Sequence, residues 1–139
     1  DQVLRMVAKQ IASLVSPLEA DGNAVITARY GGEEFAVAIY GPGARKLPRL
    51  ADDIRNAISE FNFLIRNAEG EVLENGLKVT VSAGVAECLR DWSGSIQENL
   101  LDSADKALYA AKGAGRNIVM TCKESEESGF RQVTRKQAG

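Results

Sequence analysis

The sequence predicts a single α+β domain in which helices cover a β-sheet, and three observations support this class. The chain has 139 residues, a length that suits one domain with its own hydrophobic core. Hydrophobic residues make up 45% and charged residues 26% of the chain, a balance typical of globular proteins. Segments with helical periodicity alternate with short segments rich in β-branched and aromatic residues, and no internal repeat is visible.

The first part of the chain predicts a helix followed by a β-hairpin. Within residues 2–15, apolar side chains recur at a one-sided helical spacing, and Pro17 with the polar residues after it predicts the end of this helix. Residues 24–30 and 35–40 are short segments rich in β-branched and aromatic residues, with Gly31-Gly32 between them. Two such strands around a glycine pair are typical of a hairpin.

The middle of the chain predicts a second helix and then a long strand. Residues from about 44 to 60 carry apolar side chains on one helical face. Residues 61–76 are ambiguous, because Phe63-Leu64-Ile65 fits a short strand while the residues after it fit a loop or a small hairpin. Residues 77–88 alternate clearly, which predicts a strand. One face of that strand should carry Leu77, Val79, Val81, Ala83 and Val85.

The last part of the chain predicts a helix, a strand and a polar tail. Ser95 and Glu98 form a capping-box pattern at the start of a helix that runs to about Lys112. The inward face of this helix should carry Leu101, Ala104, Leu108 and Ala111. Residues 117–121 predict a final strand, and we expect residues 122–139 to form a polar tail outside the domain.

Charge and rare residue types exclude several classes of function. The net charge of −2 gives no support for a broad nucleic-acid or membrane surface, but it allows a small phosphorylated ligand held by a local cluster of cations. The chain has no histidine, which excludes Ser-His-Asp and Cys-His catalysis and counts against a zinc enzyme. Cys88 and Cys122 lack a metal-ligand spacing, and we expect them to be free thiols in a reducing cytosol.

The start of the chain indicates a fragment of a cytoplasmic protein. No signal peptide and no apolar run of membrane length is present, so we expect a cytoplasmic location and no membrane contact by this domain. The chain opens at Asp1 inside a predicted helix and has no initiator methionine, so we expect it to be a piece of a longer protein.

The predicted hairpin is the strongest candidate site for chemistry. Gly31 and Gly32 would let the backbone turn tightly and let a ligand approach the main chain, whose N–H groups can face phosphate oxygens. Glu33 and Glu34 follow at once, and two carboxylates at an accessible turn suit a hard cation such as Mg²⁺. Considered alone, a plain hairpin with solvated glutamates remains the simpler interpretation.

The segment from Lys112 to Arg116 is the second candidate site. Cations at the C-terminal end of a helix are favourable for electrostatic reasons alone, and that is the simpler interpretation. The functional alternative is a clamp for a triphosphate, in which the arginine bonds bidentately and the lysine acts as a point charge.

Four segments together resemble the GGDEF family of diguanylate cyclases. The segment from Arg29 to Phe35 resembles the family signature in its GGEEF form. Residues 79–86 are similar to the later strand of the family, and residues 104–117 resemble its last helix and final strand. Asp1-Gln2-Val3-Leu4 resembles the second half of its helix motif. The resemblance spans residues 1–121 and implies a sheet of the nucleotide-cyclase and polymerase-palm (ferredoxin-like) class, mainly antiparallel, flanked by helices and lacking its first strand and most of its first helix.

The resemblance also implies an activity. Members of the family condense two GTP molecules into cyclic di-GMP with release of two pyrophosphates, in a homodimer whose protomers each hold one GTP. Glu33 would bind Mg²⁺ or Mn²⁺ and would help to deprotonate the attacking 3′-hydroxyl, with Glu34 beside it as a second catalytic candidate. An upstream sensor domain is expected as well.

The resemblance further implies the nucleotide-binding residues. Asp1 would read the guanine edge, while Lys112 and Arg116 would bind the terminal phosphates. A site built around such a polar partner of guanine can reject adenine by about 10⁴-fold. The complete set comprises Asp1, Arg29, Gly31, Gly32, Lys112 and Arg116.

Several departures from the family pattern bear on function. The missing first strand carries another metal-binding aspartate in the family, so we expect weak metal binding and little cyclase activity from these residues alone. The R-x-x-D inhibitory motif is absent, since Gly22 and Val25 occupy its positions, and an acid near Asp53 replaces its partner arginine in the next helix. Product inhibition would therefore act at the hairpin. The alternatives are a catalytically silent module that binds cyclic di-GMP or GTP, and a purely dimerising output domain.

Overall fold

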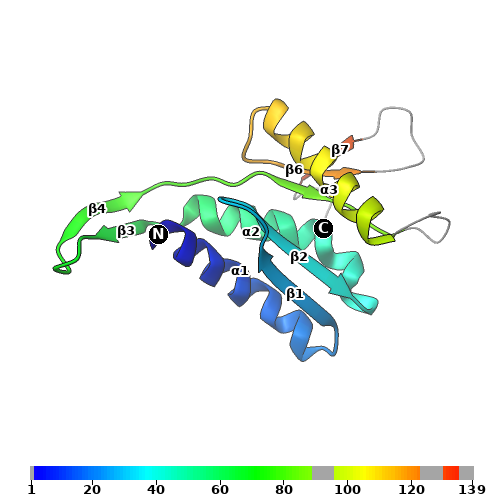
Figure 1. Ribbon diagram of the computed structural model, residues 1–139, viewed down its shortest axis with the longest axis horizontal. Coiled ribbons are helices and arrows are strands. Elements are labelled where there is room, and N and C mark those ends of the chain that lie inside the picture. The colour runs from blue at the N-terminus through cyan, green and yellow to red at the C-terminus, as the bar shows by residue number, and fades with distance from the viewer. Residues whose placement is uncertain (1, 89–95, 123–129, 135–139) are drawn as a thin grey trace.

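The computed structural model describes residues 2–88, 96–122 and 130–134 of the chain (Figure 1). Helices and strands alternate along it, which confirms the mixed α+β class. The elements are α1 (Gln2–Ala20), β1 (Ala24–Arg29), β2 (Phe35–Tyr40), the 3-10 helix η1 (Pro42–Lys46), α2 (Leu47–Glu60), β3 (Phe63–Arg66), β4 (Val72–Leu77), β5 (Ala83–Val85), α3 (Ile96–Gly113), β6 (Val119–Cys122) and β7 (Phe130–Val133).

Helix α1 continues past Pro17, so the prediction that this proline ends the helix is wrong. A proline removes one N–H donor, but the next turn still forms, because the Asp21 N–H donates to the Pro17 carbonyl at 3.1 Å. The helix ends at Ala20, and Gly22, two residues later, has a φ of 92° in the left-handed region. The Asn23 N–H then returns to the Leu18 carbonyl at 3.1 Å, which closes the helix end.

The main core lies between the first two helices and the hairpin. α1 and α2 pack against each other, and β1 lies against α1 (Figure 1). The hairpin is antiparallel as predicted, with Ala24 opposite Tyr40 and Arg29 opposite Phe35. One of its faces contributes partly buried apolar side chains to the core. The buried core residues are Val7, Ile11, Val15, Leu18, Leu50, Ile58 and Phe63.

The ambiguous residues 61–76 form a second antiparallel hairpin, made of β3 and β4. In Figure 1 this hairpin extends away from the rest of the molecule on the side of the N-terminus. Gln2 at the start of α1 supports it, because its side-chain amide accepts from the Arg66 N–H at 2.8 Å and donates to the Arg66 carbonyl. The predicted helix over about 44–60 is divided between η1 and α2.

The prediction of one strand over residues 77–88 is wrong, although the alternation behind it is real. Leu77 ends β4, and β5 comprises only Ala83–Val85. Val79 and Val81 pack against the core, as their alternation predicts, while Lys78 and Thr80, which alternate with them, are exposed. A strand also requires a partner for its backbone groups, and residues 78–82 have none among the described strands.

Helix α3 packs on β5 and β6 with a buried face that the sequence predicted in part. Ala107 and Ala111 are fully buried, but Leu101 is 37% exposed, so its predicted inward position is wrong. Leu101 faces a groove beside β5 that no described residue fills. The capping-box prediction is not tested, because Ser95 and the side chain of Glu98 lie outside the described residues.

The described C-terminal residues contain one more strand than the sequence predicted. The last predicted strand forms as β6, which pairs in parallel with β5, with Ala83 opposite Val119. Within the expected tail, Phe130–Val133 forms β7 and pairs antiparallel with β6. The prediction of a tail over 122–139 is therefore wrong for Cys122, which ends β6, and for β7. β7 forms because the edge of β6 offers N–H and C=O groups with which a further segment can pair.

The described strands form three sheets, β1–β2, β3–β4 and β5–β6–β7, rather than the one mainly antiparallel sheet that was expected. A groove of about 1230 Å³ runs between β2 and β5, and α3 lines it with Leu101, Ala104 and Leu108. β2 pairs only with β1 and β5 only with β6, so in the described part of the chain the strand edges at this groove are unpaired. None of the described helices combines the length and the apolar character needed to cross a membrane.

Candidate functional site

The turn of the first hairpin is held by backbone and side-chain hydrogen bonds. The Glu34 carbonyl accepts from the Tyr30 N–H at 2.8 Å and from the Gly31 N–H at 3.4 Å. The Arg29 guanidinium donates to the Gly32 carbonyl through Nε at 3.1 Å and Nη2 at 2.6 Å. Arg29, which was predicted to bind nucleotide, thus braces the turn from within.

The two glycines of the turn are not required by backbone conformation. Neither Gly31 nor Gly32 has a positive φ, so this turn does not use the left-handed region that glycine enters most freely. A Cβ on Gly32 would meet nothing within 4 Å, and one on Gly31 would meet only the Glu34 side chain, at 3.9 Å. The main chain at this turn is therefore accessible to a ligand, and a side chain here would stand in the ligand's way.

The two glutamates of the hairpin have different surroundings. Both are exposed. Glu33 makes no hydrogen bond or ion pair with any described residue, so its carboxylate is available. Glu34 Oε1 lies 4.0 Å from Lys112 Nζ, and each of these side chains is 45% exposed. An exposed pair at that distance contributes little to stability, but it shows that the hairpin turn and the end of α3 are neighbours.

The end of α3 carries the two predicted phosphate ligands on a turn of unusual conformation. The Arg116 N–H returns to the Ala111 carbonyl at 3.1 Å and the Gly115 N–H to the Lys112 carbonyl at 3.4 Å, the hydrogen bonds of a Schellman motif. Gly115 has φ 114°, and the two residues after it are also left-handed, with φ 63° at Arg116 and 53° at Asn117. The Lys112 and Arg116 side chains are both exposed.

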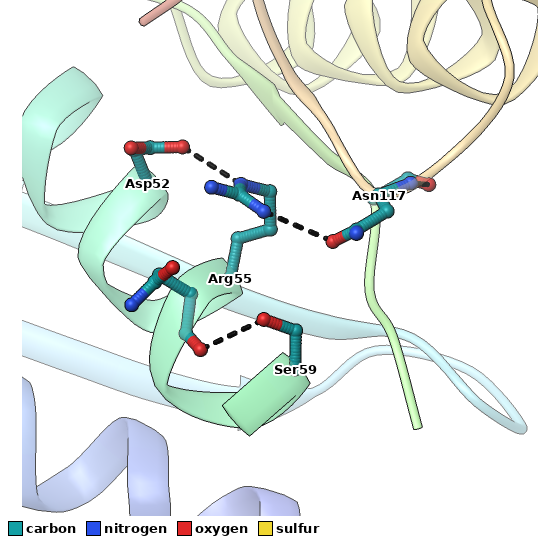
Figure 2. Close-up of polar contacts among 6 residues, drawn as sticks. Asp52, Arg55, Ser59 and Asn117 are labelled. Carbon is teal, nitrogen blue, oxygen red and sulfur yellow. Dashed lines mark hydrogen bonds and ion pairs between the residues drawn. The ribbon is translucent and has the colours of Figure 1, made fainter. Parts of the chain in front are cut away.

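Beneath this turn lies a polar network that the sequence did not indicate (Figure 2). Arg55 on α2 donates through Nε to Asp52 Oδ1 at 2.7 Å and through Nη1 to Asn117 Oδ1 at 3.1 Å. The Asn117 N–H donates to Ser82 Oγ at 3.1 Å. Asp52 is 4% exposed. The spacing of Asp52 and Arg55, three residues apart, is one signal in the sequence that could have indicated an ion pair within one helix. Asn117, the other partner of Arg55, is 62 positions away in the sequence, so no local pattern could have indicated that contact.

The hairpin could hold a divalent cation together with a nucleotide. No group of three or more His, Cys, Asp or Glu side chains gathers within the described residues, so a site made of protein ligands alone is not formed there. Mg²⁺ usually takes one or two carboxylates and completes its shell with phosphate oxygens and water. Glu33 and Glu34 fit that donor set. Asp1, the predicted guanine ligand, lies outside the described residues.

The comparisons with known proteins agree with these features. The family model "Diguanylate cyclase, GGDEF domain" matches residues 1–118. The response regulator PleD of Caulobacter vibrioides is 36% identical over 120 residues, which cover 86% of this chain and 24% of PleD. The diguanylate cyclase VdcA of Vibrio cholerae is also 36% identical over 120 residues, which cover 86% of this chain and 32% of VdcA. The chain thus spans only about a quarter to a third of these relatives.

Solved structures are similar over most of the chain. The GGDEF domain of DgcB from Caulobacter crescentus, in complex with c-di-GMP, is 34% identical with a TM-score of 0.66, and the match covers 87% of this chain and 63% of that one. The active GGEEF domain of a diguanylate cyclase from Vibrio cholerae is 28% identical with a TM-score of 0.67, covering 90% of this chain and 69% of that one. With the family model matched over residues 1–118, the chain belongs to the GGDEF diguanylate cyclase domain family.

Proposed function

We propose that this domain condenses two GTP molecules into cyclic di-GMP and releases two pyrophosphates. The observation that carries the proposal is the meeting of the signature hairpin with the end of α3, where Lys112 Nζ lies 4.0 Å from Glu34 Oε1. A nucleotide bound over that junction would contact carboxylates and cations at once. Phosphoryl transfer depends mostly on such positioning and charge neutralisation, for which no histidine is needed.

The residues of the junction divide into three roles. The accessible main chain at Gly31 and Gly32 would let the nucleotide approach closely. Glu33, which is exposed and unpaired within the described residues, would hold a Mg²⁺ or Mn²⁺ ion that neutralises phosphate charge when bound. Lys112 and Arg116 would bind the terminal phosphates. Asp1 would accept hydrogen bonds from the guanine edge.

The reaction requires two copies of the domain that face each other. The 3′-oxygen of one GTP forms a bond to the α-phosphorus of the other, and the bond from that phosphorus to the bridging oxygen breaks, so that pyrophosphate leaves. The hydroxyl proton passes to a base, for which Glu33 is our candidate. A second transfer of the same kind closes the ring. We therefore infer a homodimer. We also infer that an upstream domain regulates it in the cytoplasm, and one relative, PleD, is named a response regulator.

We also propose that a strand preceding residue 1 in the full-length protein fills the groove between β2 and β5. Both strands have an unpaired edge there in the described part of the chain, and an open edge favours the addition of a strand. Such a strand would join two of the three sheets into one. It would also bring a second acidic metal ligand close to Glu33, which the described residues do not supply.

Product inhibition, we infer, acts at the hairpin itself. Gly22 and Val25 stand where an R-x-x-D inhibitory motif would lie, and Asp53 stands near the place of its arginine partner. Cyclic di-GMP presents guanine and phosphate groups that the proposed half-site would already bind. Titrating cyclic di-GMP against Glu33→Gln or Gly31→Val should therefore show weaker binding than the unaltered protein, and undiminished binding would contradict this site.

The function is tested by following GTP turnover with Mg²⁺ in the protein that includes its natural preceding segment. We expect cyclic di-GMP from GTP, no product from ATP, and a loss of rate of about 10²-fold or more in Glu33→Gln. Glu69→Gln is the matched control, because Glu69 is an exposed glutamate in the β3–β4 turn. Equal rates in the two variants would exclude the role of Glu33. Equal turnover by residues 1–139 alone would exclude the proposed strand.

A second candidate function is nucleotide binding without turnover. The observation that favours it is the lack of a third metal-ligating side chain near Glu33 within the described residues. The same experiment separates the two functions, since a silent module would bind GTP or cyclic di-GMP in calorimetry and yet yield no product.

A further inference from the structure

The turn that follows α3 is held in a conformation that its own residues do not favour. Arg116 and Asn117 have φ values of 63° and 53°, directly after Gly115 at 114°. Glycine adopts this region freely and asparagine tolerates it, but for arginine it is strained. Strained residues persist only where surrounding contacts determine them, and they gather at functional sites. The contacts around this turn therefore indicate what fixes it.

Asn117 is fixed by contacts from two other parts of the chain. Its N–H donates to Ser82 Oγ at 3.1 Å, just before β5, and its Oδ1 accepts from Arg55 Nη1 at 3.1 Å, on α2. Figure 2 shows Arg55 reaching from α2 to Asn117 with its guanidinium between Asn117 and Asp52. The turn is thus attached to helix α2 and to Ser82, the residue before β5.

Arg55 itself is oriented by a buried acid. Its side chain is 17% exposed and that of Asp52 is 5% exposed, with Nε and Oδ1 2.7 Å apart. A buried ion pair contributes little net stability compared with apolar packing, but it fixes the geometry of both groups. Arginine suits this role because its planar guanidinium presents separate donors to Asp52 and to Asn117, whereas lysine offers one compact ammonium.

We propose that Arg55 is a positioning residue for the phosphate site, because through Asn117 it holds the turn that carries Arg116 and follows Lys112. This inference rests on the proposed function, in which those two cations bind the terminal phosphates of GTP. Arg55 would not touch the nucleotide. Its loss should weaken the binding of the β- and γ-phosphates and leave the binding of guanine and of the α-phosphate unchanged.

The test compares two ligands that differ only in the groups Arg55 should affect. Calorimetry with Mg²⁺ measures the Kd of GMP and the Kd of a GTP analogue with a methylene group between the α- and β-phosphorus atoms, which cannot be turned over. The unaltered protein should bind the analogue more tightly. In Arg55→Met the Kd of the analogue should rise about fivefold to tenfold, while the Kd of GMP changes less than about twofold.

Three further single variants and one double variant separate positioning from general damage. Asn117→Gly keeps the left-handed conformation accessible but removes the acceptor, so it should reproduce Arg55→Met, and the double variant should add nothing. Arg55→Lys keeps a cation beside Asp52, so it should unfold later on heating than Arg55→Met yet still bind the analogue weakly. Arg66→Met is the matched control, because the Arg66 guanidinium also donates a hydrogen bond within the domain, but to the Gly70 backbone carbonyl at 2.8 Å in the β3–β4 hairpin.

The outcomes distinguish failure of this inference from failure of the proposed function. If the unaltered protein shows no preference for the analogue over GMP, the proposed function is wrong and the positioning role falls with it. If that preference exists and folded Arg55→Lys and Asn117→Gly retain it in full, the proposed function stands and the positioning role is refuted. These two variants decide the matter even where Arg55→Met fails to fold.

Discussion

Gly84 provides the sharpest test of the packing that supports the site. It lies in the middle of β5 beneath α3, and a Cβ built on it would stand 2.1 Å from the Ala104 carbonyl oxygen and 2.2 Å from the Leu108 nitrogen. Ordinary van der Waals contact begins near 3.4 Å, and both neighbours are backbone atoms of one helix. Since neither can rotate away, Gly84→Ala would force α3 to retreat from β5 by more than an ångström.

The cost follows from the size of that displacement. Overpacking of a close-packed interior costs typically about 1–3 kcal/mol, and a rigid helix leaves no side chain to absorb the clash, so we expect about 3 kcal/mol. For a domain of this size, that loss lowers the midpoint of thermal unfolding by roughly 10 °C. The measurement is unfolding followed by circular dichroism. Gly113→Ala is the matched control, because a Cβ there meets nothing within 4 Å.

The comparison of the two alanine variants decides whether the close contact is real. Gly113→Ala should leave the midpoint unchanged or raise it slightly, since alanine favours the helix. The packing argument is wrong if Gly84→Ala unfolds within about 2 °C of the unaltered protein, because even 1 kcal/mol would shift the midpoint by more than that. Since α3 also carries Lys112 at its end, Gly84→Ala should weaken nucleotide binding as well.

Two other contacts make separate predictions. Asn23 links the end of α1 to η1, because its Oδ1 accepts from the Gly43 N–H at 2.8 Å and its Nδ2 donates to the Leu18 carbonyl at 3.0 Å. Asn23→Ala should therefore cost about 1–2 kcal/mol in urea unfolding, and a cost near zero would show that these bonds are replaced by water. A hydrogen bond from Lys106 to Asp102, with their charge attraction, raises the pKa of the lysine, so any stability the pair contributes is present below the ordinary lysine pKa and is lost as pH rises through the raised value. Asp102→Asn should lower the Lys106 pKa measured by NMR, and an unchanged pKa would contradict that cause.

Local sequence patterns predicted those parts of the fold that depend mainly on residues close together along the chain, such as the first hairpin. The hairpin of β1 and β2 follows from two short apolar strands around a turn, and it forms with the expected strands. The exposed glutamates and the helix-terminal lysine could likewise be placed on their elements. Pro17 misled the prediction because a proline weakens a helix without ending it. The helix ends at Ala20, and Gly22 supplies the left-handed residue that closes this end.

What the sequence could not supply is pairing between distant segments. Alternation over residues 77–88 correctly places Val79 and Val81 on the core side, but whether such a segment becomes a strand depends on a partner elsewhere. β7 was missed for the converse reason, since the short Phe130–Val133 segment lies among polar residues and its partner β6 lies elsewhere in the chain. Arg55 and Asn117 are 62 positions apart, so no local pattern indicates their contact.

The candidate site depends on helix α2 as the common support of two separate sheets. The hairpin that carries Glu33 and the sheet that contains β5 and β6 share no strand pairing within the described residues. α2 contributes Leu50 and Ile58 to the core on which the hairpin rests, and from the same helix Arg55 holds the turn that carries Arg116. Because a helix is rigid, α2 fixes the distance between the carboxylate side and the cation side of the site. A nucleotide that contacted both sides would connect the hairpin to the sheet of β5 and β6. Because it would bind only the folded domain, its binding free energy should appear directly as added stability of that domain.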